Sequence, residues 1–312
     1  MVRLLVAGEL NADMVMSGLP SLPILGRELV GDDFQIVMGS SSAITAARLA
    51  QLGADVDFVG IIGEDSLGEF VITELGNFGV GTANIAKVGE RTGVTIALTY
   101  TQDRALFTFP GTIETYTGDN ITAELLANYS HLHVGSFFLQ TALQPNLARI
   151  FQVARELGLT TSLDVGWDPQ EKWADNVYLY PTLEHVDFFI PNQDEANAIM
   201  GENQKPQSLA QRVHDTLIIK QGKDGATAYD QHNKITKVAS LKVDAIDTTG
   251  AGDAFNAGFI FAHKIKQLPI EEAMEFAVAC GAQAVTNIGG ASNAPHEDHI
   301  WEMIAQSNQN GA

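Results

Sequence analysis

The residues with the clearest capacity for chemistry lie in one short stretch, Asp247-Thr248-Thr249-Gly250-Ala251-Gly252-Asp253. Residues 239–246 before it alternate in hydrophobicity and predict a strand, and the apolar run from Ala254 predicts a helix. The glycines leave the amides of residues 250–252 uncovered where unpaired N–H groups and the helix dipole favour an anion. A carboxylate at Asp253 would repel that anion. A base that must face a phosphate being transferred would explain its presence there. An ordinary glycine turn capped by Asp253 explains the spacing equally well.

Other polar residues follow predicted strands. Asn11 and Asp13 come shortly after a predicted buried strand at residues 3–7. Ligands of open α/β sheets bind at the carboxyl ends of the strands, so both side chains can face a polyhydroxylated ligand. A polar loop with Asx turns would give the same pattern. Asn192 and Glu195 have the spacing of a capping box, and Lys220 could simply be an exposed residue of a β-hairpin.

Composition excludes several classes of protein. The chain has 312 residues, 45% of them hydrophobic, which suits one large α/β domain with an insertion, or two domains. A net charge of -20 argues against nucleic-acid and anionic-membrane partners. The single cysteine, Cys280, lies in an apolar run and predicts packing rather than a disulfide or a zinc cluster. With no apolar run long enough for a signal peptide or a membrane span, we expect a soluble, cytoplasmic protein.

A second sheet is predicted beside the main one. Residues 14–37 contain short alternating pieces broken by prolines and glycine, and residues 94–100 and 105–109 alternate in the same way. Such runs predict paired strands rather than strand–helix–strand units.

The stretch D-T-T-G-A-G-D resembles the C-terminal signature of the ribokinase-like (PfkB) sugar and nucleoside kinases. Further motifs along nearly the whole chain follow that family's order. The resemblance implies a three-layer αβα sandwich with a mostly parallel central sheet, formed by residues 1–12, 38–92 and 111–312. It also implies that residues 13–37 and 93–110 form a β lid, which would exclude water from the reaction. A homodimer formed through that lid is left open.

The resemblance assigns roles by position. It makes Asp253 the general base and Gly250, Ala251 and Gly252 the anion hole, with ATP, Mg²⁺ and a sugar or nucleoside as ligands. The implied acceptor-binding residues are Asn11, Asp13, Gly39, Ser40, Gln140 and Asp253. Those implied for ATP are Asn192, Lys220, Gly222, Gly225 and Gly252. Asn192 and Glu195 would order Mg²⁺ through water, and a K⁺ ion could be held by Asp247, Thr249, Ala284, Asn287, Gly289 and Asn293.

This chain departs from the family pattern around the acceptor. Ser40 replaces the second of two glycines, and Gly166 and Asp168 replace the Asn and Arg that often follow Asp164. The acceptor loops at residues 8–13, 39–44, 136–140 and 164–168 contain no Lys or Arg and carry several carboxylates. A buried phosphate without cations is costly, so we expect a neutral acceptor, a free ribose- or fructose-like sugar.

Four alternatives stay open. A nucleoside is the second choice of acceptor, because a base could stack on Phe107 and Phe109 of the lid. Lid residues Arg27, Arg91 and Arg104 could hold a phosphosugar, although we expect them to be solvated. A sugar-binding relative without activity would lack the intact Asp253 motif. A NAD-linked oxidoreductase would need a G-x-G-x-x-G turn after the first strand, which is absent.

Overall fold

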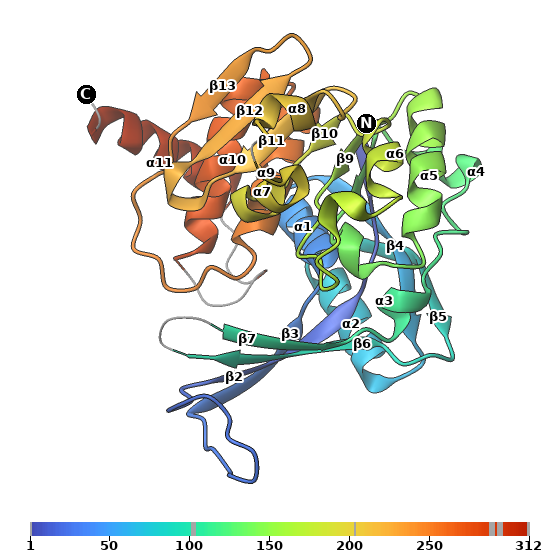
Figure 1. Cartoon of the computed structure of the whole chain (residues 1–312), viewed down its shortest axis with the longest axis vertical. Coiled ribbons are helices and arrows are strands. Elements are labelled where there is room, and N and C mark those ends of the chain that lie inside the picture. Colours follow the sequence, from blue (N-terminus) through green and yellow to red (C-terminus); the bar gives the residue numbers. More distant parts are fainter. Residues whose placement is uncertain (1, 101–103, 203, 287–290, 292–295, 311–312) are drawn as a thin grey trace.

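A nine-stranded sheet with helices on both faces forms the body of the molecule, and a four-stranded sheet projects from it (Figure 1). The computed structural model describes residues 2–100, 104–202, 204–286, 291 and 296–310. This arrangement confirms the expected three-layer α/β fold with a mostly parallel central sheet and a small lid sheet.

The large sheet is parallel from β11 to β5, and β12 and β13 add an antiparallel edge. In spatial order its strands are β13 (Ile235–Val238), β12 (Ala226–Asp230), β11 (Thr216–Lys220), β10 (Phe188–Phe189), β9 (Thr160–Leu163), β8 (His131–Val134), β1 (Arg3–Ala7), β4 (Asp55–Gly63) and β5 (Gly81–Val88). The chain leaves β1 in one direction for β4 and later in the other for β8. Ligands of open α/β sheets bind at such a switch of strand order.

Two hydrophobic cores lie on opposite faces of this sheet, because alternate side chains of a strand point to opposite faces. Leu4 and Val6 of β1 belong to one core, and Leu5 and Ala7 belong to the other. Helices α1 (Ser41–Gln51), α2 (Ser66–Asn77), α9 (Ala251–Ile260), α10 (Ile270–Ala284) and α11 (Glu297–Asn310) cover the first core. Helices α4 (Ala123–Leu126), α5 (Gln144–Glu156), α6 (Leu179–Leu183), α7 (Gln193–Met200) and α8 (Pro206–Ala210) cover the second.

Short helical segments fill the connections. They are α3 (Thr112–Thr115), the 3₁₀ turns Phe137–Leu139, Trp173–Asp175 and Gly222–Asp224, and the π-helical turn Phe261–Ile265 that continues α9. Cys280 is buried and reduced in α10, as its apolar surroundings predict.

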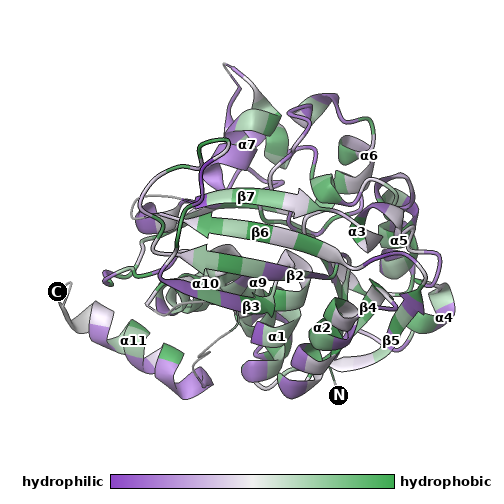
Figure 2. Cartoon of the chain, turned by 90° about the horizontal axis from the view of Figure 1, so that it is seen from below, coloured by the Kyte–Doolittle hydropathy of each residue, from purple (hydrophilic) through white to green (hydrophobic). Residues whose placement is uncertain are grey.

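The lid sheet has the order β3 (Asp33–Met38), β2 (Asn11–Ser17), β6 (Gly93–Thr99) and β7 (Arg104–Phe109). Figure 2 looks onto these strands, which run side by side. Strands β2 and β6 are parallel, and the other pairs are antiparallel. The division of the chain into the domain ranges given above stays a prediction.

The two faces of the lid sheet differ. Asp13 pairs with Thr95, and Thr95 pairs with Thr108, so these three side chains share one face, which we call the inner face. The neighbouring set of Met14, Ile36, Ile96, Phe107 and Phe109 lies on the other, outer face. Ile36, Ile96, Phe107 and Phe109 are all exposed there.

The strand expected at residues 239–246 does not form. Strand β13 ends at Val238, and the chain continues to α9 without regular structure. The amides of Ile246 and Asp247 bond instead to the carbonyl of Val285, at the end of α10. The alternating pattern was misleading because the segment crosses from the edge of the sheet to a helix without a partner strand, and Ile246 stays exposed.

None of the helices in the described part of the chain is long and apolar enough to cross a membrane. The expected location in the cytoplasm stays a prediction.

Candidate active site

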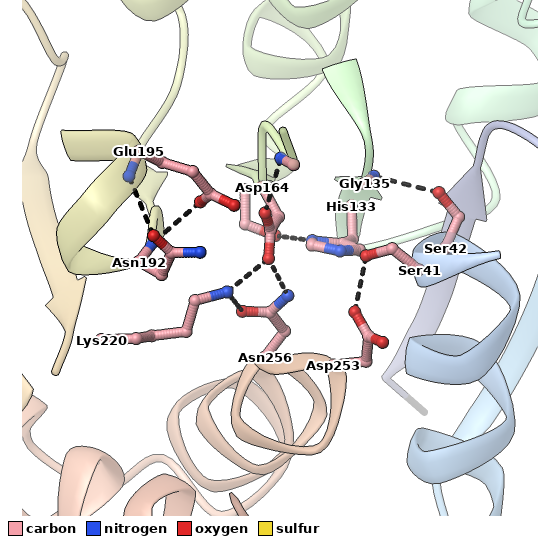
Figure 3. A network of polar contacts seen from close by, with 12 residues as sticks. Ser41, Ser42, His133, Gly135, Asp164, Asn192, Glu195, Lys220, Asp253 and Asn256 are labelled. Carbon is pink, nitrogen blue, oxygen red and sulfur yellow. Dashed lines mark hydrogen bonds and ion pairs between the residues drawn. The ribbon is translucent and has the colours of Figure 1, made fainter. Parts of the chain in front are cut away.

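The polar residues singled out in the sequence converge at the carboxyl ends of the parallel strands. Asn11 and Asp13 follow β1, Asp164 follows β9, Asn192 follows β10 and Lys220 ends β11. Helix α9 starts opposite these strand ends and brings Asp253 among them (Figure 3). The convergence follows from topology, because parallel strands present all their carboxyl ends at one edge.

Asp253 lies in the first turn of α9 and is held by a serine from α1. The hydroxyl of Ser41 donates a hydrogen bond of 2.6 Å to Asp253 Oδ1. Burial, with the negative charge of Asp164, raises the pKa of Asp253 to about 7, while the Ser41 bond and the charge of Lys220 oppose the rise. A carboxyl with a pKa near the working pH can take a proton and later release it, as a general base must.

The glycine motif forms the start of α9 as predicted. Gly250 caps the helix in the left-handed conformation, with φ 74°, which glycine adopts without strain. A β-carbon at Gly252 would lie 3.3 Å from Lys220 Nζ, so the motif and the lysine are close neighbours. The amide of Ala251 bonds to the carbonyl of Thr248 at 3.3 Å in this structure. The backbone amides at the start of α9 and the ammonium of Lys220 together form a positive region that suits an anion.

Lys220 is tied into a buried network. Its Nζ lies 2.5 Å from Asp164 Oδ2, and Asn256 Nδ2 donates to the same oxygen at 2.6 Å. Burial alone would raise the pKa of Asp164, but Lys220 and the bond from Asn256 hold it below its ordinary value. Asp164 therefore neutralises part of the charge of Lys220. The rest of that charge is available to an anion beside Gly252.

Asn192 and Glu195 form a complete capping box at the start of α7. Asn192 Oδ1 accepts from the Glu195 amide at 2.9 Å, and Glu195 Oε2 accepts from the Asn192 amide at 2.8 Å. Burial and the charge of Asp164 raise the pKa of Glu195 to about 7. A cation beside this carboxyl would lower the cost of its charge, so the oxygen-rich pair fits Mg²⁺. No cluster of three His, Cys, Asp or Glu side chains suited to a metal occurs within the described residues.

The expected acceptor residues Asn11, Asp13 and Gly39 come together at the start of β2. Asn11 Nδ2 donates to Asp13 Oδ1 at 2.7 Å and to Thr95 Oγ1 of the lid at 3.3 Å. A β-carbon at Gly39 would lie 2.2 Å from Asp13 Oδ1, so only glycine leaves room for this pair. Burial raises the pKa of Asp13 to about 6, and the bond from Asn11 and the charge of Arg104 oppose the rise.

Ser40 stands where the backbone has φ 71°, a left-handed conformation that glycine adopts without strain and other residues rarely adopt. Its hydroxyl accepts from the Ala43 amide and donates 2.6 Å to the carbonyl of Glu9. Gln140 is fully buried and donates to the carbonyl of Gly135 at 2.6 Å, beside Gly8. Ser40 therefore shapes the acceptor loop through the backbone, and Gln140 lies beneath it.

The turn expected to contact ATP lies between β11 and β12. Gly222 has φ 54°, and Gly225 has φ 93° with a position for a β-carbon only 1.9 Å from the carbonyl of Val238. Both glycines are thus required by the backbone of this turn. The side chain of Gln221 links the turn to Gln193 of α7 at 2.8 Å.

Three of the residues expected to hold K⁺, Asp247, Thr249 and Ala284, lie within the part of the chain that the structure describes. Asp247 Oδ1 accepts from the amide and the hydroxyl of Thr249 at 2.9 and 2.7 Å. The bonds to Val285 bring this loop to the end of α10, where Ala284 lies. Asn287, Gly289 and Asn293 lie outside the described residues.

One expectation about the acceptor site needs correction, and another is incomplete. Phe107 and Phe109 point to the outer face of the lid, so they cannot stack on a base in the site; strand alternation gives the inner positions to Thr108 and its neighbours. Arg104 is exposed, as expected of a lid arginine, but solvent is not its only partner, because its guanidinium donates to the hydroxyl of Thr249 from the inner face.

Asp168, at the position where the family pattern often has Arg, faces its own loop. Its carboxylate accepts from the amides of Gln170, Lys172 and Trp173 at 2.8 to 2.9 Å. The carboxylate of Asp168 therefore stabilises the loop of residues 168–173 through these bonds and is not directed at a ligand.

The sequence alone did not reveal three residues of the site. Ser41 was hidden in a run of serines, Asn256 in an apolar helix, and Thr95 in a lid strand. A polar residue inside the apolar run after Asp253 was the one available signal, because a buried amide needs a partner.

Most of the chain matches a known protein family. The model of the pfkB family carbohydrate kinases matches residues 27–297. A ribokinase of Haemophilus influenzae is 28% identical over 310 residues, covering 96% of this chain and 98% of that protein. An ATP-dependent ribose-1-phosphate kinase of Halopiger xanaduensis is 29% identical over 309 residues, covering 98% and 99%.

Solved structures share the fold. Arabidopsis thaliana ribokinase, complexed with ribose and ATP, superposes with a TM-score of 0.83 at 23% identity, covering 97% of this chain and 99% of that one. A ribokinase II of E. coli in complex with ATP and Mg²⁺ superposes with a TM-score of 0.84 at 21% identity, covering 98% and 100%.

Proposed function

Since the chain belongs to the pfkB family of carbohydrate kinases and is an ATP-dependent carbohydrate kinase, we propose that its acceptor is a free sugar resembling ribose or fructose. The reaction is transfer of the γ-phosphoryl group of ATP to a hydroxymethyl group. The arrangement of Asn11, Asp13 and Gly39, beside the loop whose Ser41 contacts Asp253, carries this proposal, because a carboxylate and an amide bind neutral hydroxyls well.

The chain's own residues divide the work. Asp253 takes the proton of the acceptor hydroxyl while the hydroxyl oxygen forms a bond to the γ-phosphorus of ATP. The bond between the γ-phosphorus and the bridging oxygen breaks, and ADP leaves with that oxygen. The amides of Gly250, Ala251 and Gly252 stabilise charge that develops on the transferred group. Asn11 and Asp13 orient the acceptor.

The donor side uses β11, α7 and the hairpin turn. Lys220 and the turn from Gly222 to Gly225 contact the phosphates and nucleotide. Asn192 and Glu195 would hold Mg²⁺, and the ion would neutralise phosphate charge when bound. Proteins of the same fold have been solved in complex with ATP, and with ATP and Mg²⁺, which supports ATP and Mg²⁺ as ligands; the residue roles are part of the proposal.

A phosphosugar is the second candidate acceptor, and Arg104 is the observation in its favour. This arginine shares the inner face of the lid with Asp13, contacts Thr249 and acts electrostatically on Asp13. An acceptor phosphate placed there would meet a cation. The nucleoside alternative loses its support, because Phe107 and Phe109 face outward.

The test is kcat/KM for ribose, fructose, adenosine, ribose 1-phosphate and fructose 6-phosphate under one set of conditions. The proposal expects a free sugar to be preferred. A phosphosugar preferred by about tenfold, the effect of one added charged contact, would overturn it, and Arg104→Met should then remove the preference. Failure to phosphorylate any acceptor would point to an inactive sugar-binding relative.

We further propose that the lid sheet closes over the acceptor and excludes water. A K⁺ ion at Asp247, Thr249 and the end of α10 would order the start of α9, since oxygen ligands suit hard cations. Equal rates in potassium and in tetramethylammonium buffers would exclude the K⁺ site.

A further inference from the structure

Of the three consecutive serines at the start of α1, the outer two bond to Glu9 and the middle one does not. The hydroxyl of Ser40 donates to the backbone of Glu9, and that of Ser42 donates to the Glu9 carboxylate at 2.6 Å. The middle one, Ser41, instead crosses to the facing helix and reaches Asp253. The contact of Ser41 with the base is thus a separate feature of the loop, not one member of a general network.

The position of Ser41 is tightly defined. It is the first residue of α1, which packs against α9 in the same core. A β-carbon at Gly135 would lie 2.9 Å from the Ser41 hydroxyl, so the backbone after β8 confines this group from behind. Figure 3 shows the hydroxyl pointing at the carboxylate of Asp253.

We propose that Ser41 is a positioning residue for the general base: by donating to Oδ1 of Asp253 it fixes the carboxylate and leaves Oδ2 for the acceptor's proton. This inference rests on the proposed function, in which Asp253 takes that proton. It adds the residue that determines which oxygen does so.

The surroundings of Asp253 explain why a neutral donor fits here. Asp164 after β9, Glu9 after β1, Lys220 on β11 and Arg48 on α1 are the charged groups that act on it. A further cation in contact with the carboxylate would hold it ionised and reduce its capacity to take a proton. A hydroxyl orients the same carboxylate with a weaker effect on its basicity.

The sign of the effect is fixed. The Ser41 bond favours the ionised form of Asp253, so its loss raises the pKa of that carboxyl further. The acid limb of the kcat/KM profile then moves to higher pH, because less of the base is ionised at a given pH. A hydrogen bond to a charged group corresponds to a shift of about 1 pH unit.

The experiment compares Ser41→Ala with two other variants of the full chain. Ser41→Thr keeps the hydroxyl and should return the acid limb toward that of the wild type. Ser66→Ala makes the same change at the first position of α2, where the side chain is exposed, and should leave the profile unchanged.

The expected result for Ser41→Ala is an acid limb shifted upward by about 1 pH unit, with a lowered plateau and an unchanged KM for ATP. A profile that superposes on that of the wild type, or one lowered evenly at every pH, would overturn the positioning role.

A second measurement needs no turnover. The ¹³C shift of the Asp253 carboxyl, assigned with Asp253→Asn, should titrate at higher pH in Ser41→Ala than in the wild type. If no acceptor is phosphorylated but the titration shifts, the proposed function fails and the contact stands. If turnover occurs and the titration midpoints agree, the inference fails alone.

Discussion

At the scale of single residues, the environment of Asp253 sets the behaviour of the site. Burial makes the ionised carboxylate costly, and the pKa rises to about 7. The proposed base is therefore partly protonated near neutral pH. A stronger cationic partner would remove this property, as Lys220 does for Asp164, whose pKa is lowered.

We expect kcat/KM to rise with pH through a midpoint near 7, because Asp253 must be ionised to accept the proton. Asp253→Asn keeps the size of the side chain and removes the base, so kcat should fall about 10²- to 10⁴-fold. Calorimetry should show unchanged ATP binding. A variant with nearly normal kcat would exclude Asp253 as the base.

The same variant should be more stable than the wild type at high pH. The pKa of Asp253 is raised from 3.8 in the unfolded chain to about 7, so its contribution to stability is lost as pH rises between these values. Asn cannot ionise. We expect the Tm of Asp253→Asn to exceed that of the wild type by roughly 2–5 °C at pH 8 and to match it at pH 4. Equal Tm values at both pH values would contradict the raised pKa.

At the scale of elements, one ion pair joins β11 to the segment after β9, and Asn256 adds α9 to it. The exposed fractions of the Lys220 and Asp164 side chains are 11% and 6%. Such a pair adds little compared with an apolar substitute, but either partner alone is a buried, uncompensated charge. The pair therefore fixes how the strand ends and α9 approach each other.

Lys220→Met should lower the free energy of unfolding by about 3–5 kcal/mol, since Asp164 loses its partner. Lys87→Met provides the matched control, because Lys87 pairs with Glu69 at the surface, where loss of a pair costs about 1 kcal/mol or less. Urea unfolding of both variants measures the difference. Similar losses would show that the Lys220 pair behaves as a surface pair.

The contact between β2 and the loop before α1 gives another prediction. Gly39→Ala should raise the KM of the acceptor and leave that of ATP unchanged, because the added carbon would displace Asp13 and Asn11. Gly89→Ala is the control, since a β-carbon there meets nothing within 4 Å. An unchanged acceptor KM in Gly39→Ala would remove these residues from the acceptor site.

The sequence predicted a helix or strand correctly where neighbouring residues alone specify it. Strand β1 and the start of α9 were correct, because buried runs and a glycine junction specify them directly. Residues 239–246 alternated without a strand beside them, so the prediction was wrong. The facing of Phe107 depended on strand register, which the alternation in β7 leaves undetermined. Ser41 reaches Asp253 only because two distant helices pack together.

At the scale of the whole molecule, exposed apolar side chains gather on the outer face of the lid sheet. Ile36, Ile96, Phe107 and Phe109 are each more than 40% exposed. Contiguous apolar surface of this kind is typical of an interaction site. A second copy of the chain could cover it, as the homodimer through the lid requires.

We predict that the wild type has twice the 33.5 kDa mass of one chain in light scattering. Ile96→Glu should shift the mass to that of the monomer, because a charge would be buried between lids. Ile235→Glu, at an exposed apolar residue of β13, is the control and should keep the dimer. A monomeric wild type would exclude the homodimer.

The interior position of β1, between β8 and β4, has a consequence for the way the enzyme is made. Its neighbours β4 and β8 and the base on α9 all come later in the chain, and Ser41 and Asp253 are 212 residues apart. At 5–20 residues per second, about 10 to 40 s of translation separate these two side chains. A polypeptide released from the ribosome before α9 therefore lacks both the proposed base and the helices that complete one of the two cores.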